Sequence, residues 1–185
     1  MEKPLCAGGE LHFVRLTDAD DARFPAAMAL YAESFPLHEQ RLLPSQRAIL
    51  GDARYRFALV CDGAEWVGLL LCWNTADFVY VEHFCIRPDK RNQQYGARAL
   101  ALLEAGGKPV ILEIDPPEDA ISRRRAAFYA RCGFAENPYP HVHPPYRAGQ
   151  EGHRLTVLSA PQRLDEAAYR AFARFLRETV MRNCF

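Results

Sequence analysis

The sequence predicts an α/β fold of the mixed-sheet (α+β) type, with helices flanking a central sheet. Three observations lead to this fold class. The 185 residues are enough for one compact hydrophobic core and short for two. Apolar residues make up 49% of the chain and charged residues 25%, as in an ordinary globular protein. Strand-like and helix-like segments follow one another without an internal repeat, so we expect residues 1–185 to form a single domain.

The N-terminal part predicts one strand followed by two helices. Residues 11–16 alternate between apolar and polar side chains, as a half-buried strand does. Thr17-Asp18 then supplies side chains that favour a helix start, and apolar residues recur at helical spacing over 23–35. Pro36 ends this helix because proline cannot continue the hydrogen-bond ladder. A second, short helix is expected over 42–53.

Three β-rich runs occupy the middle of the chain. Residues 56–61 and 66–73 flank the dipeptide Asp62-Gly63, a signal for a tight turn, and so predict a β-hairpin. Residues 78–86 form the third run. Its apolar character favours a central position in the sheet.

Helices and strands alternate after Arg87-Pro88. A helix is expected over 96–105 and ends at Gly106-Gly107, because glycine commonly follows the last helical turn. A loop rich in proline and aromatic residues begins at Phe134. The remaining expected elements are a strand at 109–114, a helix at 122–132, a strand at 154–159 and an amphipathic helix at 165–181.

The charge balance and the absence of targeting signals disfavour several classes of function. The 23 basic side chains equal the 23 acidic ones, so no global attraction to nucleic acid or to an anionic membrane is expected. The first ten residues lack the pattern of a secretory signal, and no apolar run is long enough to span a bilayer. We therefore expect a cytoplasmic protein that binds neither nucleic acid nor membrane.

The cysteines are scattered without a CxxC pair or the spacing of a zinc site. Several lie in apolar runs, which predicts buried reduced thiols with no catalytic part. No metal site is expected. The six residues are Cys6, Cys61, Cys72, Cys85, Cys132 and Cys184.

The segment with the most informative chemistry follows the third β-rich run. From Cys85 to Ala97 the chain passes through an apolar strand end, a basic turn and a helix start. Free backbone N–H groups at a helix N-terminus form an anion site, and Gly96 would let a ligand approach the backbone closely. This chemistry suits a pyrophosphate.

Two motifs resemble those of the GCN5-related N-acetyltransferase (GNAT) superfamily. Its acyl-CoA signature, Arg/Gln-x-x-Gly-x-Gly/Ala, is matched by Arg91 and Gly96, with Gln94 where the first glycine is usual. The second motif, aromatic-Tyr-x-x-x-Gly-Phe, is matched by residues 128–134. Ser122 stands where the family commonly has an asparagine.

The resemblance implies a GNAT-like acyl-CoA N-acyltransferase fold with an extra C-terminal helix. It also implies that acetyl-CoA is the acyl donor and that its pantetheine lies in a gap between the fourth and fifth strands. The residues that the resemblance assigns to acetyl-CoA are Phe84, Cys85, Ile86, Arg91, Asn92, Gln93, Gln94, Tyr95, Gly96, Ala97 and Ser122.

Acyl transfer to an amine requires a neutral nucleophile and a proton for the departing thiolate. The resemblance places Tyr129 where it can protonate the CoA sulfur, and packing beneath the cofactor is the alternative. Glu113 and Glu82 are equal candidates for the base, acting directly or through water. His141 and His143 lie in the Pro-rich loop, where loop packing or contact with the acceptor is favoured over metal binding.

The leading hypothesis is acetyl transfer from acetyl-CoA to a primary amine of a small molecule, because no extended charged groove is evident for a protein substrate. A protein N-acyltransferase and a non-catalytic acyl-CoA sensor or interaction module are the alternatives. A generic nucleotide-binding domain is disfavoured, since the chain lacks GxxxxGK[ST] and GxGxxG motifs. The identity of the amine and a homodimeric state are left open.

Overall fold

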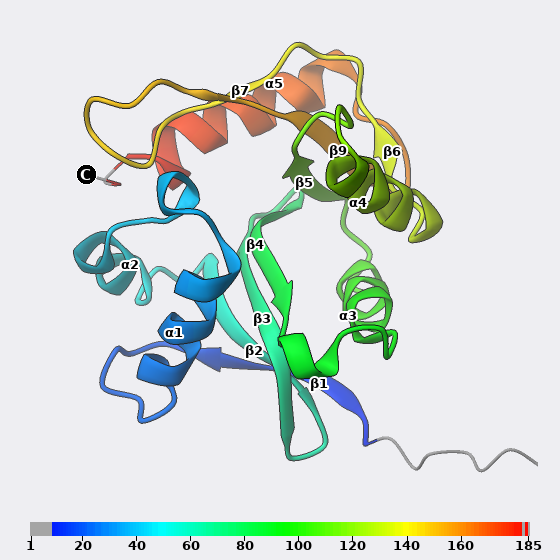
Figure 1. The fold of residues 1–185 in the computed structure, drawn as a ribbon. Helices are drawn as coiled ribbons and strands as arrows, with labels where there is room; N and C mark the ends of the chain where they lie inside the picture. The colour runs from blue at the N-terminus through cyan, green and yellow to red at the C-terminus, as the bar shows by residue number, and fades with distance from the viewer. Residues whose placement is uncertain (1–8, 183, 185) are drawn as a thin grey trace, which may run out of the picture.

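A seven-stranded mixed sheet forms the centre of the computed structural model, which describes residues 9–182 and 184 (Figure 1). The strand order is β1-β2-β3-β4-β5-β9-β6. Hydrogen-bonded neighbours are antiparallel except β4 and β5, which run parallel. This arrangement confirms the predicted mixed sheet. The strands are β1 (Leu11–Leu16), β2 (Tyr55–Asp62), β3 (Glu65–Asn74), β4 (Val79–Ile86), β5 (Val110–Ile114), β6 (Ala135–Glu136) and β9 (Thr156–Ala160).

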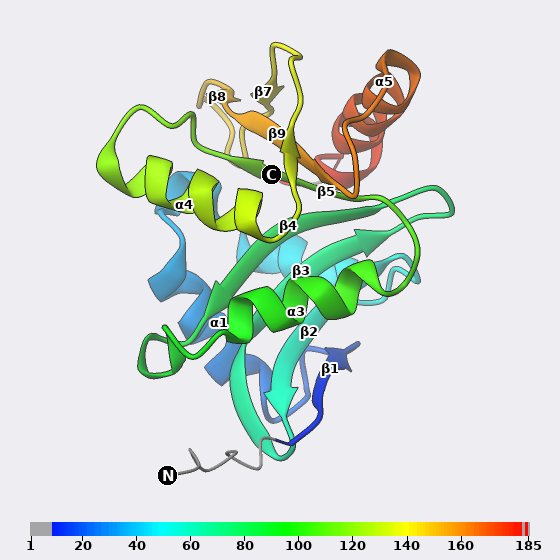
Figure 2. The ribbon, with the colours of Figure 1, turned by 90° about the vertical axis from the view of Figure 1, so that its right-hand side faces the viewer.

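Helices cover both faces of the sheet, as predicted. Apolar side chains of α1 and α5 pack on one face, and those of α3 and α4 pack on the other. Figure 2 shows α3 and α4 in front of the sheet. Within residues 9–182 and 184, no helix combines the length and apolar character needed to cross a bilayer. The helices are α1 (Phe24–Ser34), α2 (Leu43–Ile49), α3 (Tyr95–Glu104), α4 (Ala120–Arg131) and α5 (Glu166–Phe175), with short 3-10 segments η1 (Leu37–Glu39) and η2 (Pro88–Lys90).

Strand β3 shows why the central strands read as continuous apolar runs. Leu69 and Leu71 belong to the core beneath α1 and α5, whereas Leu70 and Cys72 belong to the core beneath α3 and α4. Successive side chains of a strand point to opposite faces, and here both faces are covered. Neither face therefore requires polar side chains.

Strand β4 separates from β5 partway along its length. Val81 and His83 pair with consecutive residues of β3, so Glu82 between them is the extra residue of a β-bulge. The last β4–β5 pair joins Val81 to Leu112, yet β4 continues to Ile86. A bulge bends the strand that carries it. The expected gap between these strands therefore opens at Glu82.

Two helix predictions need correction. The helix expected over 42–53 ends at Ile49, because the chain tightens into a turn in which the Leu50 N–H bonds to the Arg47 carbonyl. The helix expected over 165–181 is α-helical only to Phe175 and continues as the π-helical segment η3 (Leu176–Val180). The predicted extra C-terminal helix is nevertheless confirmed.

The segment after Phe134 contains more structure than the expected loop. Strand β6 joins the edge of the main sheet beside β9. Strands β7 (Val142–His143) and β8 (His153–Arg154) pair with each other as a separate two-stranded sheet. Strands of two residues are too short to produce a periodic pattern, and so periodicity does not predict them.

The expectation of buried thiols is only partly confirmed. Cys85 and Cys132 are half-buried, because they lie on an open strand edge and at a helix end. Burial raises the pKa of both thiols, which keeps them protonated near neutral pH. Cys6 lies outside the described residues. The buried free cysteines are Cys61, Cys72 and Cys184.

Candidate active site

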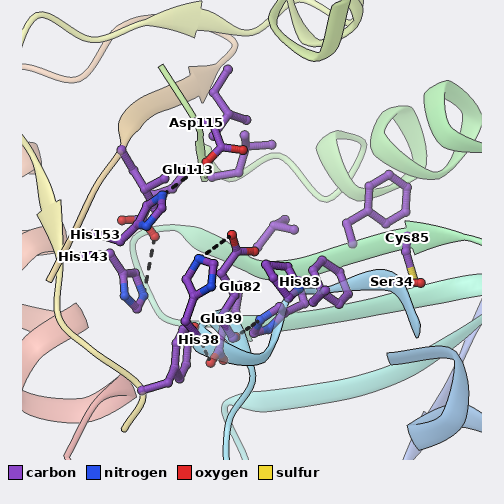
Figure 3. A pocket seen from close by; sticks show the side chains of 18 of the residues that line it. Ser34, His38, Glu39, Glu82, His83, Cys85, Glu113, Asp115, His143 and His153 are labelled. Carbon is purple, nitrogen blue, oxygen red and sulfur yellow. Dashed lines mark hydrogen bonds and ion pairs between the residues drawn. The ribbon is translucent and has the colours of Figure 1, made fainter. Parts of the chain in front are cut away.

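A cleft of about 440 Å³ lies where β4 and β5 separate. Both strands contribute to its lining, together with the end of α1, segment η1, helix α4 and parts of residues 143–155. Figure 3 shows histidines and carboxylates gathered at one end of the cleft and Ser34 and Cys85 at the other. The cleft therefore has a polar, titratable end and a strand-edge end.

The strand-edge end contains the first group of residues predicted to hold acetyl-CoA. Phe84, Cys85 and Ile86 line the cleft and are half-buried, since no strand pairs with them on the side of β5. Arg91 lines the cleft as well. Residues 92–94 form the exposed turn, and residues 95–97 begin α3. Arg91 thus joins the predicted residues of β4 at one end of the cleft, whereas residues 92–97 do not line it.

Tyr129 reaches the cleft from helix α4. Its ring packs between Phe128 and Phe134, with ring centroids 5.2 Å and 5.7 Å away. Burial raises the pKa of Tyr129 to about 12, so the hydroxyl keeps its proton near neutral pH. No described residue forms a hydrogen bond with that hydroxyl. The proton is therefore available to a ligand in the cleft.

Glu82, one of the two predicted bases, forms a buried ion pair. Its Oε1 lies 2.8 Å from Arg41 Nη2, and both side chains are only 1% exposed. Trp73 Nε1 donates to Oε2 at 2.7 Å, and the Tyr146 hydroxyl donates to Oε1 at 3.1 Å. Burial alone would raise the pKa of Glu82, but Arg41, followed by His83 and Trp73, holds it below its usual value. Such a carboxylate is a weak proton acceptor.

Glu113, the other predicted base, is also engaged on both oxygens. His141 Nε2 contacts Oε1, and the Tyr80 hydroxyl donates to Oε2 at 2.5 Å. Burial alone would raise the pKa of Glu113, but His143, His141 and Tyr80 lower it overall. Glu113 is therefore better suited to stabilise a neighbouring cation than to take a proton from an amine.

Two imidazoles of the cleft each have one nitrogen facing a backbone carbonyl. His83 Nε2 donates to the Glu39 carbonyl at 2.8 Å, and burial lowers the pKa of His83 to about 4. His143 Nδ1 lies 2.6 Å from the Pro144 carbonyl, which can only accept, so the hydrogen bond assigns the proton to Nδ1. Among the described residues, neither His83 Nδ1 nor His143 Nε2 has a hydrogen-bond partner. Only His143 Nε2 also has a carboxylate nearby, Glu113 Oε2 at 3.8 Å.

Residues 21–134 match the family model described as "Acetyltransferase (GNAT) family". This range is more than half of the chain and includes β4, the basic turn and the helix that carries Tyr129. The chain belongs to the GNAT family of acetyltransferases. The family predicted from the two motifs is thereby confirmed, as is the fold.

Individual relatives agree with this assignment. An acetyltransferase candidate of the GNAT family from Bacteroides thetaiotaomicron is 29% identical and has a TM-score of 0.86, covering 92% of this chain and 98% of its own. The acetyltransferase candidate YjbC of Bacillus subtilis (strain 168) is 27% identical over 105 residues, which are 56% of this chain and 53% of YjbC. The match thus spans about half of that curated relative.

A third relative was solved with CoA bound. This Bacillus subtilis acetyltransferase is 14% identical and has a TM-score of 0.50, with 81% of this chain and 97% of its own covered. At such low identity the likeness concerns the fold alone. The GNAT family as a whole uses acyl-CoA, and the cleft between β4 and β5 is where this chain offers an open strand edge.

Gln94 replaces the first glycine of the GNAT signature and has the backbone conformation that favours glycine. It is the N-cap of α3, with φ 63° and ψ 4°. Asn92 in the same turn also has a positive φ, of 62°. A side chain in the left-handed region costs on the order of 1 kcal/mol. The turn thus places a strained residue where the signature has a glycine.

We expect Gln94→Gly to raise the free energy of unfolding by about 0.5–1 kcal/mol, since the relief of strain exceeds the extra chain entropy of glycine. Urea unfolding of both proteins measures the change. Gln93→Gly is the matched control, because Gln93 is not among the residues with positive φ and glycine should stabilise nothing there. Equal effects of the two substitutions would contradict the assignment of strain to Gln94.

Ser122, the last residue predicted to hold acetyl-CoA, does not line the cleft. It is buried and forms a capping box with Asp119, whose side chain accepts from the Ser122 N–H at 2.8 Å while the Ser122 hydroxyl accepts from the Asp119 N–H at 3.0 Å. This cap starts α4 at Ala120, two residues before the expected start. These hydrogen bonds give Ser122 a structural role at the start of α4 that requires no cofactor.

Two residues of this site were missed by the sequence analysis. Arg41 lies in a short loop, and no spacing pattern relates it to Glu82. His83 lies in the predicted central strand beside Glu82, and a histidine next to a glutamate in such a strand is a usable signal. Contacts with segments distant in the sequence give both residues their place in the site: Arg41 reaches Glu82 and Val180, and His83 reaches Glu39.

Proposed function

We propose that the chain transfers an acetyl group from acetyl-CoA to a primary amine of a small molecule. One observation carries this proposal: the open edge of β4, Arg91 and the free hydroxyl of Tyr129 belong to the same cleft. An acyl donor with a pyrophosphate at one end and a thioester at the other fits that arrangement. Membership of the GNAT family supports the same chemistry.

In this proposal the pyrophosphate of acetyl-CoA binds the turn at residues 91–96. The first backbone N–H groups of α3 have no partners within the helix and, with the helix dipole, attract phosphate oxygens. Pantetheine then lies along Phe84, Cys85 and Ile86, where the unpaired edge of β4 offers backbone groups for hydrogen bonding. This direction brings the thioester toward Tyr129.

His143 is the proposed base. An ammonium acceptor loses one proton to Nε2, and Glu113 stabilises the resulting imidazolium from 3.8 Å. The amine attacks the thioester carbonyl and the new C–N bond forms. As the C–S bond breaks, Tyr129 gives its proton to the departing thiolate, and the second proton lost by the nitrogen passes through water to Tyr129. His143 then releases the first proton to solvent. The products are the N-acetyl amide, CoA and one proton released to solvent.

A small acceptor is favoured by the size of the cleft. Its volume of about 440 Å³ lies within the range of small-molecule sites, and it must also receive the end of pantetheine. Pro144, Pro145 and Tyr146 line the polar end and restrict the space there. An extended peptide would need a longer groove. The alternatives to be distinguished by experiment are a protein acceptor and a non-catalytic acyl-CoA sensor.

The experiment combines a binding measurement with a turnover screen. Acetyl-CoA should bind by calorimetric titration and raise the melting temperature, since a ligand at 100 times its Kd adds about 2.7 kcal/mol to stability. A library of small primary amines should then give thiol release above the hydrolysis measured without amine, with an acetylated product by mass spectrometry. No binding at millimolar acetyl-CoA would contradict the proposal. Binding with turnover only on peptides would show that the acceptor is a protein and not a small molecule.

A further inference from the structure

A group of metal-ligating side chains lies on the cleft wall and has no part in the proposed transfer. It consists of His38 and Glu39 from η1 and His153 from β8, and one ligand atom of each lies within 4.8 Å of the other two. His38 Nε2 is 3.6 Å from Glu39 Oε1, and the rings of His38 and His153 stack with centroids 5.4 Å apart. Segments more than 110 residues apart thus meet at one point.

The ligand atoms lie slightly farther apart than in an occupied site, so metal binding requires only a small movement of the side chains toward one another. Bonds of about 2.0–2.1 Å in a tetrahedral site place ligand atoms roughly 3.4 Å from one another. The His38 side chain is 49% exposed and that of His153 is 39% exposed, so both rings can move this far and an ion can enter from solvent.

Asp115 supplies the kind of partner that metal-binding histidines have. Its Oδ1 lies 3.2 Å from His153 Nε2, and its Oδ2 is held by Arg125 Nη1 at 2.8 Å. A carboxylate in this position orients the imidazole and increases its basicity as a ligand. Figure 3 shows this contact between His153 and Asp115 beside the cleft.

The cleft wall around these side chains carries two carboxylates. Glu39 is half-buried, and both Glu39 and Asp115 line the cleft. The Glu39 backbone is held in place by the hydrogen bond from His83 to its carbonyl. Two carboxylates kept near each other repel, and a bound cation would remove that repulsion.

We propose that His38, Glu39 and His153 bind one divalent cation of the zinc class at the mouth of the cleft. Two imidazoles and one carboxylate favour such an ion over Mg²⁺ or Ca²⁺, which prefer oxygen ligands. Three protein ligands leave a coordination position free, and a carboxylate or hydroxyl of the acceptor can occupy it. No local motif predicts this site, because its ligands come from two distant segments.

Metal binding can be tested without any acetyl transfer. Metal-free protein, treated with chelator and kept reduced, is titrated calorimetrically with Zn²⁺ and separately with Mg²⁺. We expect one equivalent of Zn²⁺ to bind and no Mg²⁺. Both His38→Ala and His153→Ala should weaken Zn²⁺ binding more than tenfold, and Asp115→Asn about tenfold. His12→Ala is the matched control, since His12 is exposed on β1, and it should bind as the parent does.

Co²⁺ distinguishes this site from adventitious binding to cysteine. Thiolate ligands give intense charge-transfer absorption in the near ultraviolet, and imidazole and carboxylate ligands do not. The visible spectrum of bound Co²⁺ should be lost in His153→Ala, without a thiolate band in the parent. Unchanged Zn²⁺ affinity in both histidine variants, a thiolate band or the lack of saturable binding would each overturn the proposal. None of these results bears on acetyl-CoA binding, so the two proposals can fail separately.

Discussion

Replacement of Tyr129 by phenylalanine is expected to lower kcat by about 10- to 10⁴-fold, while the affinity for acetyl-CoA stays nearly unchanged. The hydroxyl matters chiefly when negative charge develops on the departing sulfur, whereas the ring continues to pack between Phe128 and Phe134. The smaller loss would apply if a water molecule replaces the hydroxyl as the donor. Steady-state rates with the best amine, together with calorimetric titration of acetyl-CoA, measure both quantities.

The pKa of Tyr129 also predicts how this variant depends on pH. Because burial raises that pKa to about 12, the hydroxyl stays protonated throughout pH 6–9 and contributes no alkaline limb in that range. The ratio of parent to Tyr129→Phe rates should therefore be constant from pH 6 to pH 9. Tyr139→Phe is a suitable control, since Tyr139 stacks on Tyr169 and does not line the cleft. Equal rates for the parent and Tyr129→Phe, with chemistry rate-limiting, would make Tyr129 a packing residue.

The features that were predictable from the sequence are those whose parts are consecutive in the chain. The hairpin around Asp62-Gly63 and the succession of strand, basic turn and helix from Cys85 to Ala97 each lie within one short segment. A local pattern specifies such structures through turn chemistry and periodicity. The bulge at Glu82, by contrast, has no glycine or other signal, although it determines where the cleft opens.

The roles of the two carboxylates were not predictable, because long-range contacts decide them. Glu82 and Glu113 were equal candidates as strand glutamates. Arg41 neutralises the first, and histidines of the Pro-rich loop engage the second. Proton affinity depends on such neighbours at least as strongly as on residue type. These contacts engage the oxygens of both carboxylates, which is why our proposal gives the role of base to an imidazole.

His143 is the residue whose replacement best tests this change of base. His143→Asn retains an N–H donor for the Pro144 carbonyl but removes the lone pair at the position of Nε2. We expect kcat to fall by about 10²- to 10⁴-fold with little change in acetyl-CoA affinity. Glu113→Gln should lower kcat by a smaller factor, since the neutral amide still fills the space beside His143 and only the stabilising charge is lost.

The dependence of the His143→Asn rate on pH separates a base from a structural residue. The parent needs His143 to remove a proton from an ammonium acceptor, but at high pH the solvent supplies the neutral amine directly. The ratio of the parent rate to the His143→Asn rate should therefore fall as pH rises. Added imidazole should partly restore the activity of a His143→Ala variant. His12→Asn, at an exposed site on β1, should match the parent throughout. A rate ratio that is independent of pH would indicate a structural role for His143. If Glu113→Gln loses more activity than His143→Asn, Glu113 is the base.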